Sequence, residues 1–252
     1  MSKSKSGDSE PGSGRGRMHD AEGARDAILN AGEKVFAEHG FDGARIDAIA
    51  EASGYNKSLI FQYFDDKLGL YSAVIRRADT DMRVWQDEAL RELKEFTMSP
   101  AQIRDLLRRY VGVYFDYLIE HPKVLRIYNW ELAENWQTFS KIWNERDRQD
   151  VAEFTPVFAQ FQKAGLMRTE PHALLQYTTA LFACHTYLGV LSMYRDLVPG
   201  KDFDSEAAMK DGREFLIGFI TNGLMVDGSK KELSRSKKTP AHSHSARRQK
   251  EK

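Results

Sequence analysis

The sequence predicts an all-α protein in which a three-helix N-terminal domain, of the helix-turn-helix kind, precedes a larger helical domain. Apolar residues recur at the helical period through almost all of residues 21–228, and no segment shows a convincing strand-like alternation. Proline and glycine are confined to a few points between the periodic segments. A chain of 252 residues with 41% hydrophobic content can bury one large core, or join a small module to a bigger one.

The first helix is predicted from the segment ARDAILNAGEKVFAEHG, residues 24–40. Five of its residues share the i, i+3, i+4, i+7, i+8 spacing of one buried stripe: Ile28, Ala31, Gly32, Val35 and Phe36. Gly40 is expected to end this helix in the left-handed conformation, which glycine adopts without a steric penalty. Phe41 is then available to pack back on the helix.

Two short helices follow. The segment RIDAIAEAS, residues 45–53, has its large apolar residues on one side, and Gly54 is its expected stop. Asn56 suits the N-cap of a third helix at about 57–64, because its side chain can accept a hydrogen bond from an otherwise unpaired backbone N–H. A fourth helix is expected from about Lys67. Two short helices separated by a turn, packed on a longer first helix, make a helix-turn-helix domain, predicted to span residues 21–67.

The third helix has two chemically different faces. Ile60 and Phe64 lie four residues apart and can close a small core with Phe36 and Ile49. The other face carries groups that can read base edges in the major groove: Lys57, Ser58, Leu59 and Gln62. A generic short amphipathic helix also shows a polar face, so this spacing alone leaves an ordinary surface helix open.

A longer pattern favours DNA binding. The run from ARDAILNAGEKVFAEHGF to IDAIAEASGYNKSLIFQYFDDKLGLYSAVI, within residues 24–75, resembles the N-terminal DNA-binding domain of TetR-family transcriptional regulators. The shared pattern is F-x-x-x-G-aromatic, then I-A-x-x-x-G, then L/I-aromatic-x-x-F, then x-x-K-x-x-L. The resemblance implies base contacts from the four residues named above, and phosphate contacts from Tyr63 and Lys67. Lys67 also stands at a helix start, where free N–H groups and the helix dipole suit a phosphate oxygen.

The sequence departs from the family pattern at three points. Ala44 and Arg45 stand where relatives usually place Thr or Ser, so the second helix lacks a cap usually worth about 1 kcal/mol. Arg45 is expected to pair with a phosphate instead. Phe61 stands where many relatives have Tyr, and we expect it to pack. Gly32 replaces the usual alanine inside the first helix, at a cost of up to about 1 kcal/mol.

Residues 68–228 are predicted to form the second domain, with helices at 67–96, 101–120, 122–134, 136–165, 171–196 and 205–225. The resemblance implies that this domain binds a ligand and forms a dimer. Most of its many aromatic residues must be core. A subset is expected to line a cavity for a small apolar or aromatic ligand, with Asn129 and Glu131 as polar groups nearby: Tyr114, Tyr128, Trp130, Phe182 and His185.

The last two helices carry the strongest interface pattern. The resemblance implies that they pair with their copies in a two-fold homodimer, through residues that include Leu188, Leu191, Phe215, Leu216, Phe219 and Ile220. Burial of the same residues within one subunit is the alternative. A dimer would place two reading helices about 34 Å apart, on successive major grooves of a near-palindromic double-stranded DNA operator.

Composition restricts the other possibilities. The 37 basic and 37 acidic residues cancel, so overall charge predicts neither nucleic-acid binding nor its absence. The single cysteine, Cys184, can form no intrachain disulfide and has no second thiol to share a metal, and a small buried hydrophobe is its expected role. The polar, Ser/Gly-rich residues 1–20 are expected to form a disordered arm. Residues 229–252, with nine basic and two acidic side chains, are expected to form a disordered basic tail.

These observations predict a soluble, cytoplasmic DNA-binding transcriptional regulator with no cofactor, metal site or membrane partner. No segment approaches a membrane-spanning length free of charge, and no constellation of acid, base or metal-ligating residues indicates an enzyme. The expected mode of action is repression relieved by a small lipophilic ligand. A DNA-binding activator or architectural protein without such a ligand is the alternative.

Overall fold

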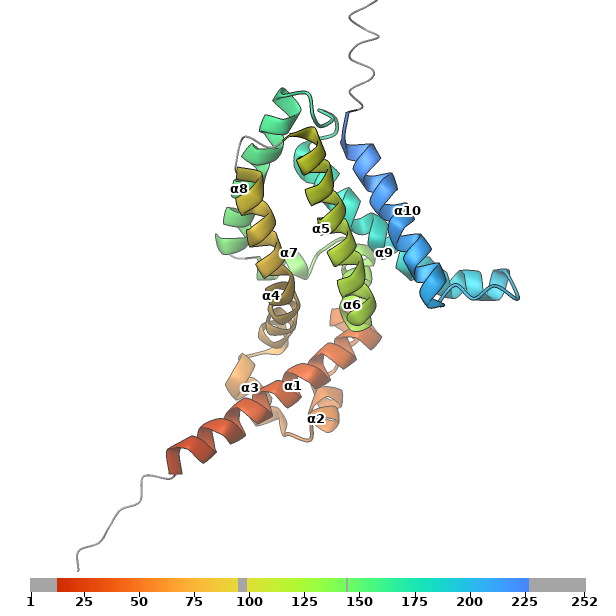
Figure 1. The fold of residues 1–252 in the computed structure, drawn as a ribbon. Helices are drawn as coiled ribbons and strands as arrows, with labels where there is room; N and C mark the ends of the chain where they lie inside the picture. The colour runs from red at the N-terminus through yellow and green to blue at the C-terminus, as the bar shows by residue number, and fades with distance from the viewer. Residues whose placement is uncertain (1–12, 95–98, 144, 227–252) are drawn as a thin grey trace, which may run out of the picture.

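The computed structural model describes residues 13–94, 99–143 and 145–226, and within those residues the chain is helical with no strand, which confirms the predicted fold class (Figure 1). The helices in chain order are α1 Ser13–Gly43, α2 Ile46–Ser53, α3 Lys57–Phe64, α4 Lys67–Lys94, α5 Pro100–Glu120, α6 Pro122–Ala133, α7 Phe139–Ile142, α8 Glu145–Lys163, α9 Ala173–Leu197 and α10 Glu206–Leu224. None of the helices in these described ranges is long and apolar enough to cross a membrane.

The first helix bends where the sequence predicts its end. Gly40 has a φ of 67°, and a short turn continues to Gly43. Phe41 packs back as expected, with its ring centroid 6.3 Å from that of Phe36 and 5.1 Å from that of Tyr71. The start of the helix differs from expectation, because α1 begins at Ser13 and residues 13–20 are therefore helical. A polar composition argues against burial of a segment, but it does not prevent a helix from extending into solvent. The rest of the expected arm and the basic tail lie outside the described residues.

The turn between α2 and α3 also follows the sequence prediction. Gly54 has a φ of 76°, and its N–H donates to the carbonyl oxygens of Ala50 and Glu51. Asn56 caps α3, since its Oδ1 accepts a hydrogen bond of 2.9 Å from the backbone N–H of Leu59. Arg45 makes no side-chain cap at the start of α2, in line with the expected loss.

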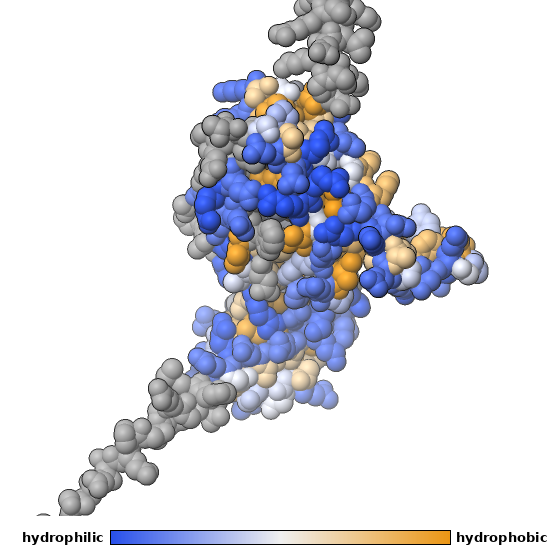
Figure 2. Space-filling view, in the orientation of Figure 1, coloured by the Kyte–Doolittle hydropathy of each residue, from blue (hydrophilic) through white to orange (hydrophobic). Residues whose placement is uncertain are grey.

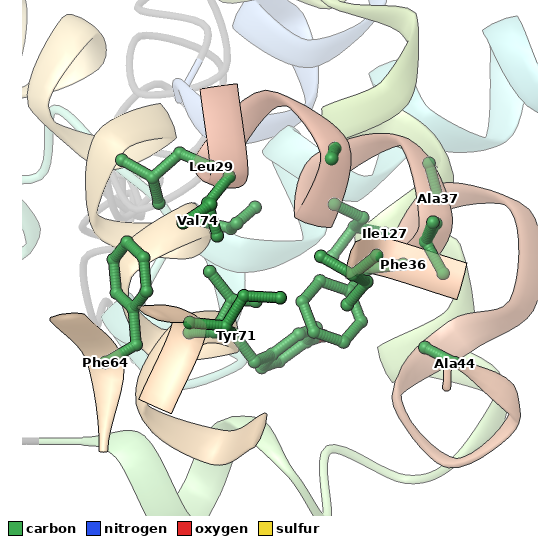
Figure 3. Close-up of a cluster of buried hydrophobic side chains, with 14 of the residues drawn as sticks. Leu29, Phe36, Ala37, Ala44, Phe64, Tyr71, Val74 and Ile127 are labelled. Carbon is green, nitrogen blue, oxygen red and sulfur yellow. The ribbon is translucent and has the colours of Figure 1, made fainter. Parts of the chain in front are cut away.

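One hydrophobic core joins the helix-turn-helix to the larger domain (Figure 3). Ile60 and Phe64 of α3 are buried in it together with Phe36 and Ile49, as the sequence predicts. Ile127 of α6 belongs to the same core, because α6 packs along α1. The packing therefore crosses the expected domain boundary after residue 67, and α6 shares one core with α3.

The larger domain contains one break that periodicity does not predict. The expected single helix over 136–165 is wrong: α7 and α8 replace it. Asn135 and Trp136 have φ values of 54° and 60°, a conformation that no right-handed helix contains. Trp136 is held there by aromatic packing, with its ring 5.6 Å from Phe139 and 5.2 Å from Phe182 of α9. The contact with Phe182 comes from a distant part of the chain and leaves no local pattern.

Candidate nucleic-acid interface and ligand cavity

Helix α3 is anchored by one face and presents the other. Ile60 and Phe64 are buried, whereas Lys57, Ser58 and Gln62 are exposed. Two further predicted contact residues, Leu59 and Tyr63, are half-buried beside them. The α3 face defined by Lys57, Ser58, Leu59 and Gln62 is therefore accessible to another molecule, and its base-reading role stays a prediction.

Phe61 does not pack as expected. Its side chain is 42% exposed, although it lies next to Ile60 on the same helix. Consecutive helical residues point about 100° apart, so a residue adjacent to the anchor can face solvent. Phe61 thus adds an aromatic group to the outer side of α3.

Lys57 is tied to the neighbouring helix. Its Nζ lies 2.5 Å from Oδ1 of Asp47 in α2. The hydrogen bond from Lys57, followed by its charge, lowers the pKa of Asp47. Because both side chains are more than half exposed, the pair adds little to stability and can open without a large cost.

Lys67 has an internal role that sequence reasoning missed. Its Nζ donates to the carbonyl oxygen of Phe41 at 2.8 Å and to that of Ala44 at 3.2 Å, with the carbonyl of Asp42 at 3.5 Å. The same ammonium lies 4.4 Å from the ring centroid of Phe41. The bend at Gly40 leaves the carbonyl groups at the end of α1 without helical partners. The glycine itself was the sequence signal that a donor from elsewhere would be needed there. If Lys67 also contacts a phosphate, as predicted, its ammonium group must divide its three N–H donors between the phosphate and these carbonyl oxygens.

A cavity of about 470 Å³ opens in the larger domain, between α4, α5, α6, α9 and the segment around α7. Three of the five predicted ligand residues line it: Tyr114, Tyr128 and Phe182. The other aromatic lining residues are Tyr117, Trp136, Phe139 and Trp143, and the polar ones are Asp79, Ser140 and Thr178. The cavity is therefore apolar and aromatic, with a few polar groups, as small-molecule sites usually are.

His185 supports the wall of the cavity instead of lining it. Its Nε2 is 2.5 Å from the hydroxyl oxygen of Tyr114, and its ring packs 4.9 Å from Phe182 and 5.5 Å from Tyr128. Burial lowers the pKa of His185 to about 4, so the imidazole is neutral near pH 7. The Nδ1 atom is buried with no hydrogen-bond partner among the described residues.

Trp130 does not line the cavity, contrary to expectation. Its Nε1–H donates to the carbonyl oxygen of Ala37 at 3.2 Å, and its ring lies against Gly40. Trp130 stands on the face of α6 that packs along α1, whereas Tyr128 stands on the face toward the cavity. Helical periodicity indicates two faces but does not tell which of them meets a cavity.

Asp79 is the one charged residue that lines the cavity within the described parts of the chain. The hydroxyl of Tyr128 donates to its Oδ1 at 2.8 Å. Burial first, and the Asp79 carboxylate second, raise the pKa of Tyr128 well above its usual value. Tyr128 therefore remains a neutral donor that orients the carboxylate.

The buried Glu131 of α6 connects the cavity with the core of the helix-turn-helix. Its Oε1 accepts a hydrogen bond of 2.6 Å from the hydroxyl of Tyr71, which packs against Phe36 and Phe41. Its Oε2 accepts a hydrogen bond of 3.0 Å from the backbone N–H of Phe139, a lining residue. Burial, followed by the bond to Glu131, raises the pKa of Tyr71, so its hydroxyl stays protonated. One carboxyl group thus links both regions.

The predicted dimer residues divide into two groups. Leu191, Leu216 and Ile220 are buried within the subunit, and Leu188 is half-buried, so their packing partners lie in this chain. Phe215 and Phe219 are 60% and 63% exposed and stack on each other on the outer side of α10. Figure 2 shows hydrophobic residues at the surface on the side where α10 and the end of α9 lie. The expected stripe therefore includes both an inner and an outer face of the helix.

Comparison with known proteins agrees with this architecture. The sequence profile of bacterial regulatory proteins of the tetR family matches residues 28–74. The HTH-type transcriptional repressor NicS of Pseudomonas putida is 26% identical over 213 residues, covering 82% of this chain and 95% of NicS. The HTH-type transcriptional activator FasR of Mycolicibacterium smegmatis is 32% identical over 117 residues, which is 46% of this chain and 50% of FasR.

A solved structure shows the same fold. The crystal structure of a TetR family transcription regulator from Marinobacter aquaeolei VT8 superimposes with a TM-score of 0.58 and 22% sequence identity. The superposition covers 84% of this chain and the whole of that one. The matched profile covers the end of α1, all of α2 and α3, and the start of α4. These elements include α3 and the helices on which it packs. The family profile over residues 28–74, the similarity to NicS along most of the chain and the shared fold together support a TetR-family transcriptional regulator.

Proposed function

We propose that this regulator is a homodimeric repressor that leaves its operator when a small lipophilic molecule occupies the aromatic cavity. The name of NicS, which aligns with most of this chain, supports repression as the mode of action. Because its proposed partner is operator DNA, we place the protein in the cytoplasm.

In this proposal, α3 reads the operator. Lys57, Ser58, Leu59 and Gln62 contact base edges, while Arg45, Tyr63 and Lys67 contact phosphates. The exposure of Lys57, Ser58 and Gln62 on an anchored helix supports this assignment, because direct readout needs side chains that reach base edges from a rigid element. The exposed Arg45 at the start of α2 supports a phosphate contact there.

The observation that carries ligand control is the double hydrogen bond of Glu131. A ligand displaces an equilibrium only if it binds one conformation better than another. Entry of a molecule between Phe139 and the other lining residues shifts the segment whose N–H bonds to Glu131. Tyr71 bonds to the other oxygen of that carboxyl and lies in the core under α3. The same movement therefore changes the position of the reading helix.

Two exposed phenylalanines support the dimer. Phe215 and Phe219 stand on the outer side of α10, and large apolar side chains exposed together usually mark an interface. We propose that α9 and α10 pair with their copies about a two-fold axis. This spaces two α3 helices for a near-palindromic site.

The Glu131→Gln substitution tests the coupling. A carboxylate accepts hydrogen bonds at both oxygens, whereas an amide accepts at one oxygen and donates from its NH2 group. In the variant, the bond to the Phe139 N–H can persist only if the Tyr71 hydroxyl turns from donor to acceptor, and both bonds lose the charge of the carboxylate. Hydrogen–deuterium exchange of the peptide 134–143 is measured with and without operator DNA that the protein itself has selected. Coupling between two sites is reciprocal. If the conformation of the cavity segment affects the affinity for DNA, then binding of DNA must also affect the conformation of that segment. We expect DNA to alter exchange in the wild type and much less in Glu131→Gln.

Glu120→Gln, an exposed change of the same kind at the end of α5, is the matched control and should behave as the wild type does. Ligand control through Glu131 is refuted if operator DNA leaves exchange of this peptide unchanged in the wild type. The same conclusion follows if Glu131→Gln responds fully.

Activation is the second candidate mode, because FasR is named an activator and is 32% identical to this chain over 117 residues. The two modes predict opposite changes in a reporter gene placed behind the selected operator. Deleting the regulator raises expression if it represses and lowers expression if it activates.

A further inference from the structure

The end of α9 projects from the body of the subunit. In Figure 1, the last turns of α9 and the loop after them extend beyond α10, away from the other helices. We call residues 192–205 the α9 arm; they end at Ser205, the N-cap of α10. Large apolar side chains are exposed on the arm, and Figure 2 shows hydrophobic residues on this projection: Met193, Tyr194, Leu197 and Val198. Single exposed apolar residues are ordinary, but such a group usually marks an interface.

The α9 arm is held in a defined shape by contacts within itself. The rings of Tyr194 and Phe203 lie 6.1 Å apart, so the loop packs back on the end of α9. Nε of Arg195 lies 2.5 Å from Oδ2 of Asp204, and the N–H of Asp204 donates to Oδ1 of Asp202 at 3.0 Å. A surface that is already ordered loses little conformational freedom when it binds. The arm is therefore suited to docking on another molecule.

One exposed line of residues connects the arm with the rest of α9. Its members are spaced by four or seven residues, which places them on one side of a helix: Leu175, Thr179, Thr186, Met193 and Leu197. Thr179 also lines a groove of about 240 Å³ together with Phe219, one of the two exposed phenylalanines of α10. The apolar surface of the arm is thus continuous with the face that we propose as the dimer contact.

The two ends of the same chain are poor candidates for covering the arm. Residues 1–12 and 227–252 contain two large apolar side chains between them, Met1 and Leu233. A second copy of the chain carries the same apolar face, and a two-fold axis brings the same surface of both copies together. We propose that the α9 arm of each subunit packs on the partner subunit. This inference rests on the proposed function, because it adds a contact to the proposed homodimer.

The Leu197→Glu substitution tests this contact. Leu197 is 64% exposed in the subunit and stands at the end of α9, so the variant should fold, as circular dichroism can check. A charge buried against the partner would lose water without a counter-ion. The dissociation constant of the dimer is measured by sedimentation of the full chain without DNA. We expect it to rise about tenfold or more in Leu197→Glu.

Val84→Glu is the matched control. It introduces the same charge at another exposed apolar site, on α4, which lies on the other side of the subunit from the arm in Figure 1. We expect it to keep the dissociation constant of the wild type.

Oxidation of Met193 tests the contact without any substitution. Met193 is 50% exposed within the subunit, so hydrogen peroxide can reach its sulfur in the monomer. The wild-type chain is oxidised at concentrations above and below its dissociation constant, and the peptide that contains Met193 is followed by mass spectrometry. We expect oxidation to be several-fold slower where the dimer predominates, because the partner covers the arm.

The proposal is overturned if Leu197→Glu keeps the dissociation constant of the wild type, or if Met193 is oxidised equally fast in monomer and dimer. Either result with a dimeric wild type refutes the arm contact and leaves the proposed homodimer standing. A wild type that stays monomeric at every concentration refutes the proposed homodimer, and the arm contact with it.

Discussion

At the scale of single residues, Lys67 shows how a predicted DNA contact can also hold the fold together. Its ammonium donates to carbonyl oxygens at the end of α1 and lies over the ring of Phe41. Removing it would leave those oxygens without a donor, at a cost of about 1–3 kcal/mol. Weaker DNA binding by Lys67→Ala could therefore result from the loss of a phosphate contact or from the loss of stability, and the binding measurement would not separate the two. Lys57 and Gln62 are cleaner probes, because both are exposed and Lys57 pairs with an exposed carboxylate of α2.

His185 gives a prediction on pH. Its pKa is about 4 in the folded chain, against 6.5 for an unperturbed histidine, because burial disfavours the imidazolium. Between these pH values the unfolded chain binds a proton that the folded chain does not, so stability falls as pH falls from 6.5 toward 4. The contribution of this one group is about 3 kcal/mol over the window. Urea unfolding at several pH values measures it.

His185→Gln should flatten this dependence, because an amide does not titrate but can still bond to Tyr114. Carboxyl groups also titrate near the lower end of the window, so the informative quantity is the difference between variant and wild type. Parallel curves for the two proteins would contradict the assignment.

At the scale of elements, local signals predicted the helix-turn-helix well. The bend at Gly40, the turn at Gly54 and the cap at Asn56 each depend on residues within one helical turn, and all three are present. The break at Trp136 depends on rings from α9 and could not be read from local spacing. The same limit explains Trp130, which has the same aromatic character as the lining residues but stands on the face of α6 toward α1.

The start of α2 gives a prediction at this scale. Arg45 occupies the N-cap position without a side-chain hydrogen bond. Arg45→Ser should add a cap and raise the free energy of unfolding by about 1 kcal/mol. The same change should weaken DNA binding and reduce its salt dependence by about one counterion, if Arg45 contacts a phosphate. Urea unfolding and fluorescence anisotropy at several salt concentrations measure the two effects.

Arg45→Ala is the matched control, since it removes the charge without supplying a cap. It should weaken DNA binding as much as Arg45→Ser does and should not gain stability. Equal stability of the two variants would count against the missing cap, and an unchanged salt dependence in both would count against the phosphate contact.

At the scale of the whole molecule, the proposed ligand control requires that the α3 face, the cavity and the proposed subunit interface act together. Glu131 joins the first two through hydrogen bonds to Tyr71 and Phe139. The interface follows less directly from the sequence. An apolar stripe such as that of α10 contains residues buried within the subunit as well as residues buried between subunits, and the pattern does not distinguish the two groups. The structure separates its members: Leu216 and Ile220 face the inside, while Phe215 and Phe219 face outward.

The outward pair gives a prediction on assembly. Phe219→Glu places a charge in the proposed dimer contact, where it would lose water without a partner. We expect the variant to sediment as a monomer at concentrations where the wild type is a dimer, and to lose most of its operator affinity. Val84→Glu, at an exposed apolar site on α4, is the matched control and should remain dimeric. If Phe219→Glu remained a dimer, the interface would have to lie on another surface.

Selection of bound fragments from random-sequence DNA tests the DNA-reading role of α3 most directly. We expect the full chain to enrich a near-palindrome whose half-sites lie about one helical turn apart. The double variant Lys57→Ala, Gln62→Ala should fold normally, bind DNA weakly and fail to enrich that sequence. If the wild type enriches no sequence, or if the double variant enriches the same one with equal strength, α3 is not the reading helix.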